Sequence, residues 1–282
     1  MIALAALVWP PICNAQGSTT QSDASPPASF TAPAAIDTSH CSAIVAGGSQ
    51  TSPLSAVCEF ALKYRRELPD FICEQTTTTT SPTSNTVLKA EVTFEKGHER
   101  YSNVTIDGRP PDAYSSASAG IVSFLSTGEL GSDLVNLFKP PIVAEFQLRK
   151  ETRLRKIPSS VYQFHIAAEK NTFWELRDSW GMTLDPEYEG ELWLERQNGR
   201  LLRLELHPVH LPHNFQITSA DITIDYSEIR IGNLGAFLLP STSETKLCRR
   251  TGSLRCMKNV VVFHDCRKFG SETRITTDSP QP

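Results

Sequence analysis

The chain has 282 residues, 39% of them hydrophobic, which is enough for one large domain or two small ones. Its 27 basic and 31 acidic residues give a formal net charge of −4, so there is no electrostatic reason to expect binding to nucleic acid. The densest basic group lies between Arg149 and Lys156, where charged and apolar residues alternate as they do on an exposed strand.

The first fifteen residues, Met1 to Ala15, are uncharged and mostly apolar, and they end in small residues. This composition is typical of the later part of a secretory signal peptide, although the usual basic start is absent. The run is too short to cross a bilayer, and no later segment is long and apolar enough to do so. Lipid anchoring at Cys13 is disfavoured because Pro-Pro-Ile precedes it. We therefore expect a secreted or periplasmic protein without a membrane span.

The next segment, residues 16–52, is rich in Ser, Thr, Ala and Pro and predicts a disordered leader. Order is expected to begin with a helix at Pro53, because Ser52 can cap the helix and proline suits its first turn. Apolar residues from Leu54 to Leu68 recur at helical spacing, and Pro69 is expected to end the helix.

A tight turn formed by Gly97 and His98 is expected to join two further strands. This turn sets two cross-strand pairs of opposite charge and one aromatic pair, which all agree on one register. The pairs are Lys96 with Glu99, Glu95 with Arg100, and Phe94 with Tyr101.

Strands dominate the rest of the chain, because short runs of alternating or β-branched residues are separated by turn residues. A long loop over residues 113–125 and a short helix over residues 129–138 interrupt them. The expected strands span residues 71–80, 144–154, 161–168, 173–177, 191–196, 201–206, 222–226, 236–248 and 256–269. Together these segments predict about ten strands and two helices, with connections short enough for antiparallel neighbours.

The hairpin over residues 192–206 has the register most readily read from the sequence. A three-residue loop over residues 197–199, with Gly199 left-handed, keeps the leucines of both strands on one apolar face. The resulting pairs are Leu194 with Leu202 and Leu192 with Leu204. Trp193 and Arg203 then face each other on the outer side as a cation–π pair. The same alternation elsewhere predicts a large antiparallel sheet with one apolar face.

Removal of the first fifteen residues would leave six cysteines, and an even number outside the reducing cytosol favours disulfides. Cys248 and Cys256 flank a short polar segment centred on Gly252, so a hairpin there would place them opposite each other. Zinc is disfavoured because the cysteine spacings match no finger motif. The other four either pair among themselves or are free buried thiols. They are Cys41, Cys58, Cys73 and Cys266.

Three histidines, His207, His210 and His213, recur every third residue beside Pro208 and Pro212, and are the sharpest candidate for a metal site. In a polyproline helix they would lie about 9 Å apart along one edge, too far to share one ion. An exposed proline-rich connection is the preferred interpretation, so no metal site and no cofactor are predicted.

Catalytic motifs are also missing from the sequence. No G-x-S-x-G elbow accompanies the serines, Cys73 has no base beside it, and residues 128–132 lack the lysine of a phosphate loop. Glu187, Glu189 and Glu191 alternate onto one face and could serve a glycosidase, but a solvated strand end is the preferred interpretation. We predict no catalytic residues. A cleft that brings Glu187, Glu189 and a histidine together would overturn this.

Several motifs between Glu59 and Ile275 resemble a group of uncharacterised secreted proteins abundant in acidobacteria. They are Leu-Pro-Asp-Phe-Ile-Cys-Glu-Gln at 68–75, Glu-Arg-Tyr at 99–101, Ser-Thr-Gly-Glu-Leu-Gly-Ser at 126–132, Leu-Glu-Arg at 194–196 with Arg-Leu at 203–204, and Arg-Lys-Phe at 267–269. The group implies no activity. By its layout of a helix followed by a meander, the chain resembles the periplasmic lipoprotein-carrier (LolA-like) half-barrel, whose curved sheet and helices enclose an apolar ligand cavity.

These patterns predict an α+β protein with one large curved antiparallel sheet, half-barrel-like, that carries two helices on its concave face. The expected organisation is a signal-like segment (1–15), a disordered leader (16–52), a single domain (53–275) and a disordered tail (276–282).

The leading functional hypothesis is non-catalytic binding of a lipid or acyl chain in the concavity of the sheet. For each candidate lining residue a place in the core is preferred over ligand contact; these residues are Leu192, Leu194, Leu202, Leu204, Ile222 and Ile224. The alternative is a cell-envelope module that docks a protein partner through an open sheet edge. A hydrolase is the least favoured function. A filled interior, without a cavity on the order of several hundred Å³, would favour the docking module.

Overall fold

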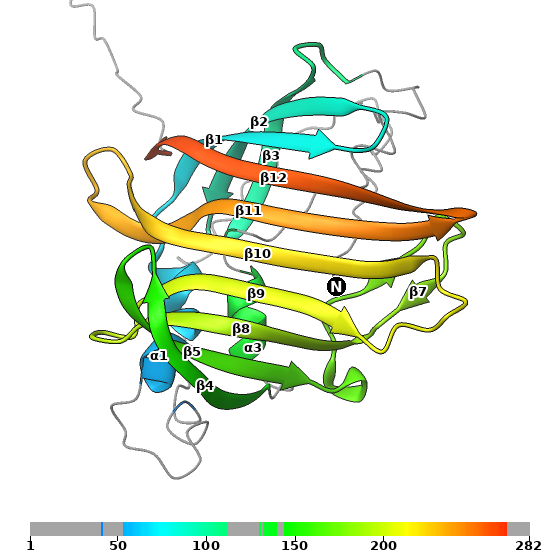
Figure 1. Cartoon of the computed structure of the whole chain (residues 1–282). Coiled ribbons are helices and arrows are strands. Elements are labelled where there is room, and N and C mark those ends of the chain that lie inside the picture. Colours follow the sequence, from blue (N-terminus) through cyan, green and yellow to red (C-terminus); the bar gives the residue numbers. More distant parts are fainter. Residues whose placement is uncertain (1–40, 42–52, 112–129, 131, 140–143, 270–282) are drawn as a thin grey trace, which may run out of the picture.

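The computed structural model of the chain describes residue 41 and residues 53–111, 130, 132–139 and 144–269. The expected signal-like segment, leader, long loop and tail lie outside the described residues, as does most of the 128–132 segment. The described part is mostly antiparallel β-sheet, with two α-helices and the short 3-10 helix η2 (Ala168–Lys170) (Figure 1).

One ten-stranded antiparallel sheet forms the body of the molecule, in the order β3-β2-β1-β12-β11-β10-β9-β8-β5-β4. Its strands are β1 (Phe71–Thr80), β2 (Asn85–Glu95), β3 (His98–Ile106), β4 (Glu145–Leu154), β5 (Ile157–Ile166), β8 (Glu187–Glu195), β9 (Leu201–Val209), β10 (Ile217–Arg230), β11 (Ala236–Thr251) and β12 (Ser253–Lys268). The large antiparallel sheet predicted from the sequence is confirmed. The sheet is open rather than closed, because β3 and β4 form its two edges.

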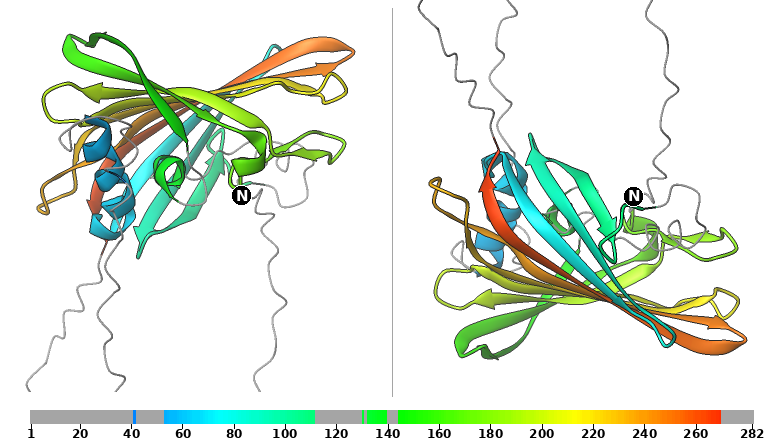
Figure 2. Two further views of the ribbon diagram at one scale, coloured as in Figure 1. Left: turned by 90° about the horizontal axis from the view of Figure 1, so that it is seen from below. Right: turned by 90° about the horizontal axis from the view of Figure 1, so that it is seen from above.

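Helices α1 (Pro53–Glu67) and α3 (Ser132–Phe138) lie on the same side of the curved sheet (Figure 2). Helix α1 begins at the predicted Pro53 and ends before Pro69, which cannot continue it. Helix α3 begins three residues later than residue 129, where the sequence analysis placed its start. The two helices contact each other, and α1 also contacts β8.

The helices bury their apolar side chains against the sheet and fill this face in two clusters. The first joins both helices to β5, β8, β9 and β10 through Leu54, Val57, Cys58, Ala61, Leu134, Leu137, Phe138, Phe164, Ile166, Tyr188, Leu192, Leu194, Leu201, Leu204, Leu206, Ile224 and Tyr226, among others. The second packs Tyr64 and Leu130 against β1, β2, β11 and β12. In the described part of the chain, this face is therefore a core made of the protein's own side chains.

The tight turn expected at Gly97 and His98 lies one residue earlier in the structure. The β2–β3 turn is formed by Lys96 and Gly97, both with positive φ, so that Glu95 pairs with His98 and Phe94 with Glu99. The predicted register, which paired Phe94 with Tyr101, is wrong. Similarly, Arg155 and Lys156 form the β4–β5 turn with positive φ, and Pro158 is the second residue of β5.

The strand predicted over residues 173–177 is reduced to two residues. Only Leu176–Arg177 (β6) is extended, and it pairs with β7 (Thr183–Leu184) in a separate small sheet that the sequence analysis did not predict. Trp174 lies just before β6, and its side chain is completely buried in the first core cluster. Packing of this ring therefore takes precedence over strand formation in the segment.

Asp133 is a buried acid at the start of α3, and it accepts a hydrogen bond from Nε1 of Trp174 at 2.9 Å. Burial above all, with a smaller contribution from the charge of Glu99, raises the pKa of Asp133 to about 7, against the lowering effect of the Trp174 bond. The folded protein therefore holds a proton that the unfolded chain releases near pH 4, and stability falls as the pH rises from about 4 to about 7.

We expect the melting temperature to be lower at pH 8 than at pH 5, and Asp133→Asn to remove most of this difference. Asparagine keeps an oxygen acceptor for Trp174 and has no charge to bury. Thermal unfolding followed by circular dichroism between pH 4.5 and pH 8 measures the effect. An Asp133→Asn profile parallel to that of the wild type would show that another group sets the pH dependence.

Candidate functional site

The six residues predicted to line a ligand cavity are not equivalent in the structure. Leu192, Leu194, Leu204 and Ile224 are completely buried in the first core cluster, beneath the two helices, and Ile222 packs against the same cluster. Leu202 differs from the others, because it is 6% exposed, lies outside that cluster and lines a surface pocket.

A β-bulge at the start of β9 gives Leu202 this separate position. Leu192 pairs with Leu204, as predicted, and Trp193 pairs with Arg203. The next residue, Leu194, pairs with Leu201, so the predicted pairing of Leu194 with Leu202 is wrong. Two residues of β9 therefore oppose one residue of β8, and the side chain of Leu202 leaves the strict alternation.

Strands β9 and β10 diverge next to this bulge. Their ladder runs from the pair Leu206 and Ile222 to the pair Arg203 and Asp225 and stops there. Strand β10 continues to Arg230, and over its last residues its described partner is β11 alone. The side of β10 that faces away from β11 between Ser227 and Arg230 therefore has no strand beside it in the described part of the chain.

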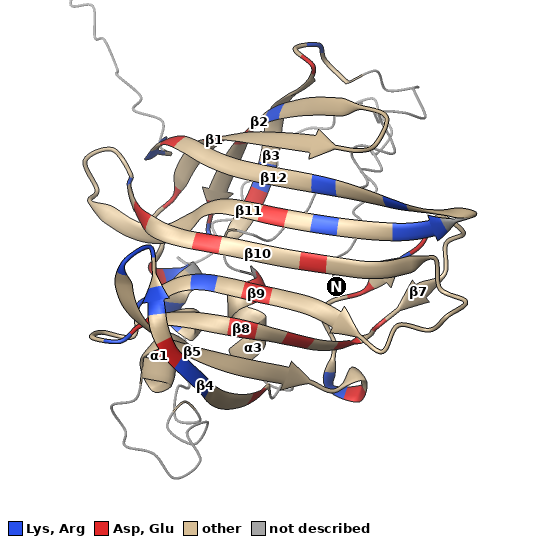
Figure 3. Cartoon of the chain, in the orientation of Figure 1, with Lys and Arg blue, Asp and Glu red and all other residues tan. Residues whose placement is uncertain are grey.

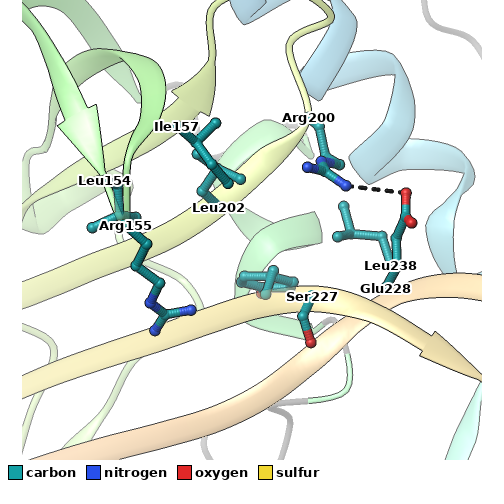
Figure 4. A pocket seen from close by; sticks show the side chains of 9 residues that line it. Leu154, Arg155, Ile157, Arg200, Leu202, Ser227, Glu228 and Leu238 are labelled. Carbon is teal, nitrogen blue, oxygen red and sulfur yellow. Dashed lines mark hydrogen bonds and ion pairs between the residues drawn. The ribbon is translucent and has the colours of Figure 1, made fainter.

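A pocket of about 150 Å³ opens where the two strands separate (Figure 4). Its apolar lining comes from the β4–β5 hairpin, β9, β10 and β11, and consists of Leu154, Ile157, Leu202, Tyr226 and Leu238. Its polar lining consists of Arg155, Arg200, Ser227 and Glu228. We call this the β9–β10 pocket.

Ion pairs satisfy the charged groups around the β9–β10 pocket. The Asp225 carboxylate accepts a hydrogen bond from Nε of Arg203 at 2.8 Å and another from Nη2 of Arg155 at 2.5 Å. The hydrogen bonds from Arg203 to Asp225 raise the pKa of that guanidinium. Arg200 bonds Glu228 at 3.1 Å, as Figure 4 shows. With these charges paired, the pocket offers a ligand mainly apolar contact.

Acidic and basic positions are interspersed along the central strands, as Figure 3 shows. On the side away from the core, Glu187 lies between two histidines, with its oxygens 2.5 Å from Nε2 of His165 and 2.9 Å from Nδ1 of His210. These hydrogen bonds lower the pKa of the Glu187 carboxyl. Glu189 stands directly across from His165 on β5 and His207 on β9.

This cluster brings together the glutamates and histidines that the sequence analysis named as the sign of a hydrolase. These residues line neither the β9–β10 pocket nor a second small pocket beside Phe215, and the side chain of His210 is 79% exposed. A histidine this exposed lies in water, whereas a substrate site excludes water, so the cluster does not favour a hydrolase.

The polyproline conformation considered for the histidine segment is not adopted, because His207 to Val209 belong to strand β9; the three histidines are exposed, as the preferred interpretation expected. His210 turns back to Glu187 with a positive φ, and His213 lines a second small pocket with Phe215. The predicted cation–π pair on the outer face also changes partner. Trp193 faces Arg203 in the ladder, but the cation over its ring is Lys150, at 5.1 Å, because Arg203 bonds Asp225.

All six cysteines among the described residues form disulfides. Cys248 is joined to Cys256 across the β11–β12 hairpin, Cys41 to Cys58, and Cys73 on β1 to Cys266 on β12. Neither helix of the described part reaches the length and hydropathy that a membrane crossing requires.

No protein-family model and no curated protein matches the chain. Among solved structures, the chain is similar to a LolA superfamily protein from Nitrosomonas europaea, with 14% identity, a TM-score of 0.39, and coverage of 79% of this chain and 96% of that chain. It is also similar to a DUF1329 family protein from Desulfovibrio piger, with 10% identity, a TM-score of 0.36, and coverage of 77% and 94%. These TM-scores are too low to assign a family, so the function is inferred from the protein's own geometry.

Of the residues that line the β9–β10 pocket, Leu202 alone was predictable from the sequence. The adjacent leucines Leu201 and Leu202 were the available signal, because two apolar residues in succession interrupt an alternating strand and mark a bulge. The contributions of Leu154, Ile157 and Leu238 had no local signal, because two segments far apart in the chain, the β4–β5 hairpin and β11, supply them.

Proposed function

We propose that this protein is a non-catalytic binding module that acts outside the cytosol and docks an extended segment of a protein partner. The segment lies along the free side of β10, from Ser227 to Arg230, and places one apolar side chain in the β9–β10 pocket. The observation that carries this proposal is that the end of β10 has no paired strand on one side, within the described residues, and lies directly beside an apolar pocket. In strand addition, main-chain hydrogen bonds supply affinity, and a pocket for a side chain supplies specificity.

The size of the pocket favours a single side chain over a whole lipid. Pockets for drug-sized ligands measure about 300–1,000 Å³, whereas this one measures about 150 Å³. An apolar cavity of about 150 Å³ holds a group the size of benzene, which is comparable to a Leu or Phe side chain. On the sheet's other candidate surface, Leu192, Leu194 and Leu204 are already covered by the helices.

The disulfides support a location outside the reducing cytosol. Three disulfides among the described residues fit a protein that folds in the periplasm or outside the cell, where thiols oxidise. A partner from the cell envelope or the extracellular space is therefore expected.

An acyl chain is the second candidate occupant, because the apolar lining would also hold the end of an aliphatic chain. The lipid-carrier hypothesis is compatible with a filled core if only the end of the lipid chain is bound, in this surface pocket. The two candidates differ in whether the free backbone of Ser227 to Arg230 takes part in binding.

Two binding experiments distinguish the two candidates. In the first, peptides that bind the protein are selected from a displayed library of random twelve-residue peptides. In the second, binding of lauric acid is tested in parallel. We expect selected peptides to carry a Leu, Ile or Phe anchor and to protect the amides of residues 227–230 from hydrogen exchange. Leu202→Arg, which fills the pocket with a charge, is expected to weaken their binding at least about tenfold. Ser227→Trp, which blocks the pocket from its rim, is expected to have the same effect.

Leu254→Arg is the matched control, because Leu254 is 61% exposed and does not line the β9–β10 pocket. This variant is expected to bind the peptides as the wild type does. A different result would identify an acyl chain, rather than a peptide, as the ligand. In that result no peptide is selected, and lauric acid binds the wild type but not Leu202→Arg. Peptides that bind Leu202→Arg and Ser227→Trp as tightly as the wild type would refute the site.

A further inference from the structure

Three metal-ligating side chains converge where β1 meets β12, on the face of the sheet away from the core. Glu74 and His264 are cross-strand partners. Asp265 follows His264, has a positive φ of 51°, and occupies an irregularity in the β1–β12 ladder. The backbone thus turns the Asp265 side chain toward the same point as its neighbours, and one ligand atom from each of the three lies within 4.8 Å of the others.

The spacing of the three ligand atoms matches a small divalent cation. Nδ1 of His264 is 2.8 Å from Oδ2 of Asp265 and 3.9 Å from Oε2 of Glu74. Tetrahedral zinc with ligand bonds of about 2.1 Å separates its ligand atoms by about 3.4 Å. The two distances from His264 bracket this value, and the two carboxylate ligand atoms lie within 4.8 Å of each other, so movements of these exposed side chains would complete the coordination.

A residue outside the group orients the imidazole. Nε2 of His264 lies 3.2 Å from Oγ1 of Thr76, the next outward-facing residue of β1 after Glu74. Without a cation, Nδ1 donates a hydrogen bond to Oδ2 of Asp265 at 2.8 Å. In the other tautomer Nε2 donates to the Thr76 hydroxyl, and the lone pair of Nδ1 then faces the two carboxylates. Such an arrangement attracts a cation, and a hydrogen bond from the second ring nitrogen is the usual support of a histidine ligand.

The surroundings hold the group in place, and its two carboxylates share one imidazole, that of His264, as an ion-pair partner. The Cys73–Cys266 disulfide links the residues next to Glu74 and Asp265. Glu91, the other cross-strand neighbour of Glu74, is engaged by Arg267 at 2.6 Å. Among the described residues, no lysine or arginine pairs with the carboxylate of Glu74 or Asp265.

We propose that Glu74, His264 and Asp265 bind a divalent ion of the zinc class, with water in the remaining coordination position. One imidazole and two carboxylates are ligands that zinc accepts, whereas calcium takes six to eight oxygens. This site is separate from the β9–β10 pocket and does not depend on the function proposed for it.

Isothermal titration of the tag-free protein with zinc chloride tests the proposal. We expect one site, with affinity reduced at least about tenfold in His264→Ala and in Asp265→Asn, and reduced about tenfold in Thr76→Val. In cobalt-loaded protein, the visible absorption of a low-coordinate ion is expected and should disappear in His264→Ala. Calcium is expected to bind far more weakly than zinc.

The matched control is His210→Ala, which disrupts the cluster of His165, Glu187 and His210. It is expected to leave zinc binding unchanged. Zinc affinity that persists in His264→Ala, or that is lost in His210→Ala, would overturn the assignment. The substituted side chains are exposed or half-exposed, and far-UV circular dichroism with a melting curve verifies that each variant folds.

Discussion

Removal of the Cys73–Cys266 disulfide, by the double substitution Cys73→Ala/Cys266→Ala, is expected to lower the free energy of unfolding by about 5 kcal/mol. A cross-link stabilises a protein mainly by restricting its unfolded chain, and the restriction increases with the logarithm of the enclosed loop. This bond joins residues with a sequence separation of 193. It links β1 to β12, which are the first and last strands along the chain and lie side by side in the sheet. Urea denaturation of the oxidised protein and the variant measures the loss.

The Cys248–Cys256 disulfide supplies the matched comparison. It spans a sequence separation of only 8, so Cys248→Ala/Cys256→Ala is expected to cost about 2.5 kcal/mol by the same relation. The two variants remove the same chemical bond from the same sheet and differ mainly in loop length. Equal losses would show that local strain or packing, rather than the entropy of the unfolded chain, determines the contribution of these bonds.

Elements with strong local signals were predictable from the sequence. Helix α1 begins at Pro53 and ends before Pro69, and strand β1 has the predicted bounds Phe71–Thr80. Proline sets these limits through its fixed φ and its missing N–H group, and a run of threonines favours the extended backbone. Such effects act within a few residues, so they survive whatever tertiary structure forms.

Turn registers are less predictable, because only weak interactions distinguish one register from the next. The charged pairs that favoured a Gly97-His98 turn are exposed and contribute little to stability. The observed turn instead places Gly97 second and requires a positive φ of 50° at Lys96, a conformation that lysine adopts rarely. Nothing in the local sequence identifies a lysine that will adopt it.

The candidate site depended on geometry that no local pattern encodes. Leu202 is an apolar residue of β9, as the alternation predicts, but the bulge at the start of β9 moves its side chain out of the shared leucine face. The β9–β10 pocket also requires β10 to leave β9 after Asp225 while it stays paired with β11. That divergence reflects the curvature of the whole sheet, which the alternation of residues in one strand does not specify.

Gly190→Ala is expected to destabilise the protein by about 3 kcal/mol, because the middle of β8 has no room for a side chain. A Cβ atom at this position would lie 2.0 Å from the backbone oxygen of Glu205 and 2.4 Å from Cζ of Phe164. The oxygen belongs to the neighbouring strand β9, so it can retreat only if the β8–β9 ladder opens. Thermal unfolding should show a decrease in melting temperature of about 6–12 °C.

Two further variants separate the backbone clash from other effects of the substitution. At Gly181, where a Cβ would meet no atom within 4 Å but φ is +82°, alanine is expected to cost about 1 kcal/mol through backbone strain alone. Adding Phe164→Leu to Gly190→Ala removes the contact with the ring but leaves the contact with the Glu205 oxygen, so the rescue should be incomplete. Full rescue would show that the ring, rather than the spacing between β8 and β9, requires glycine at position 190.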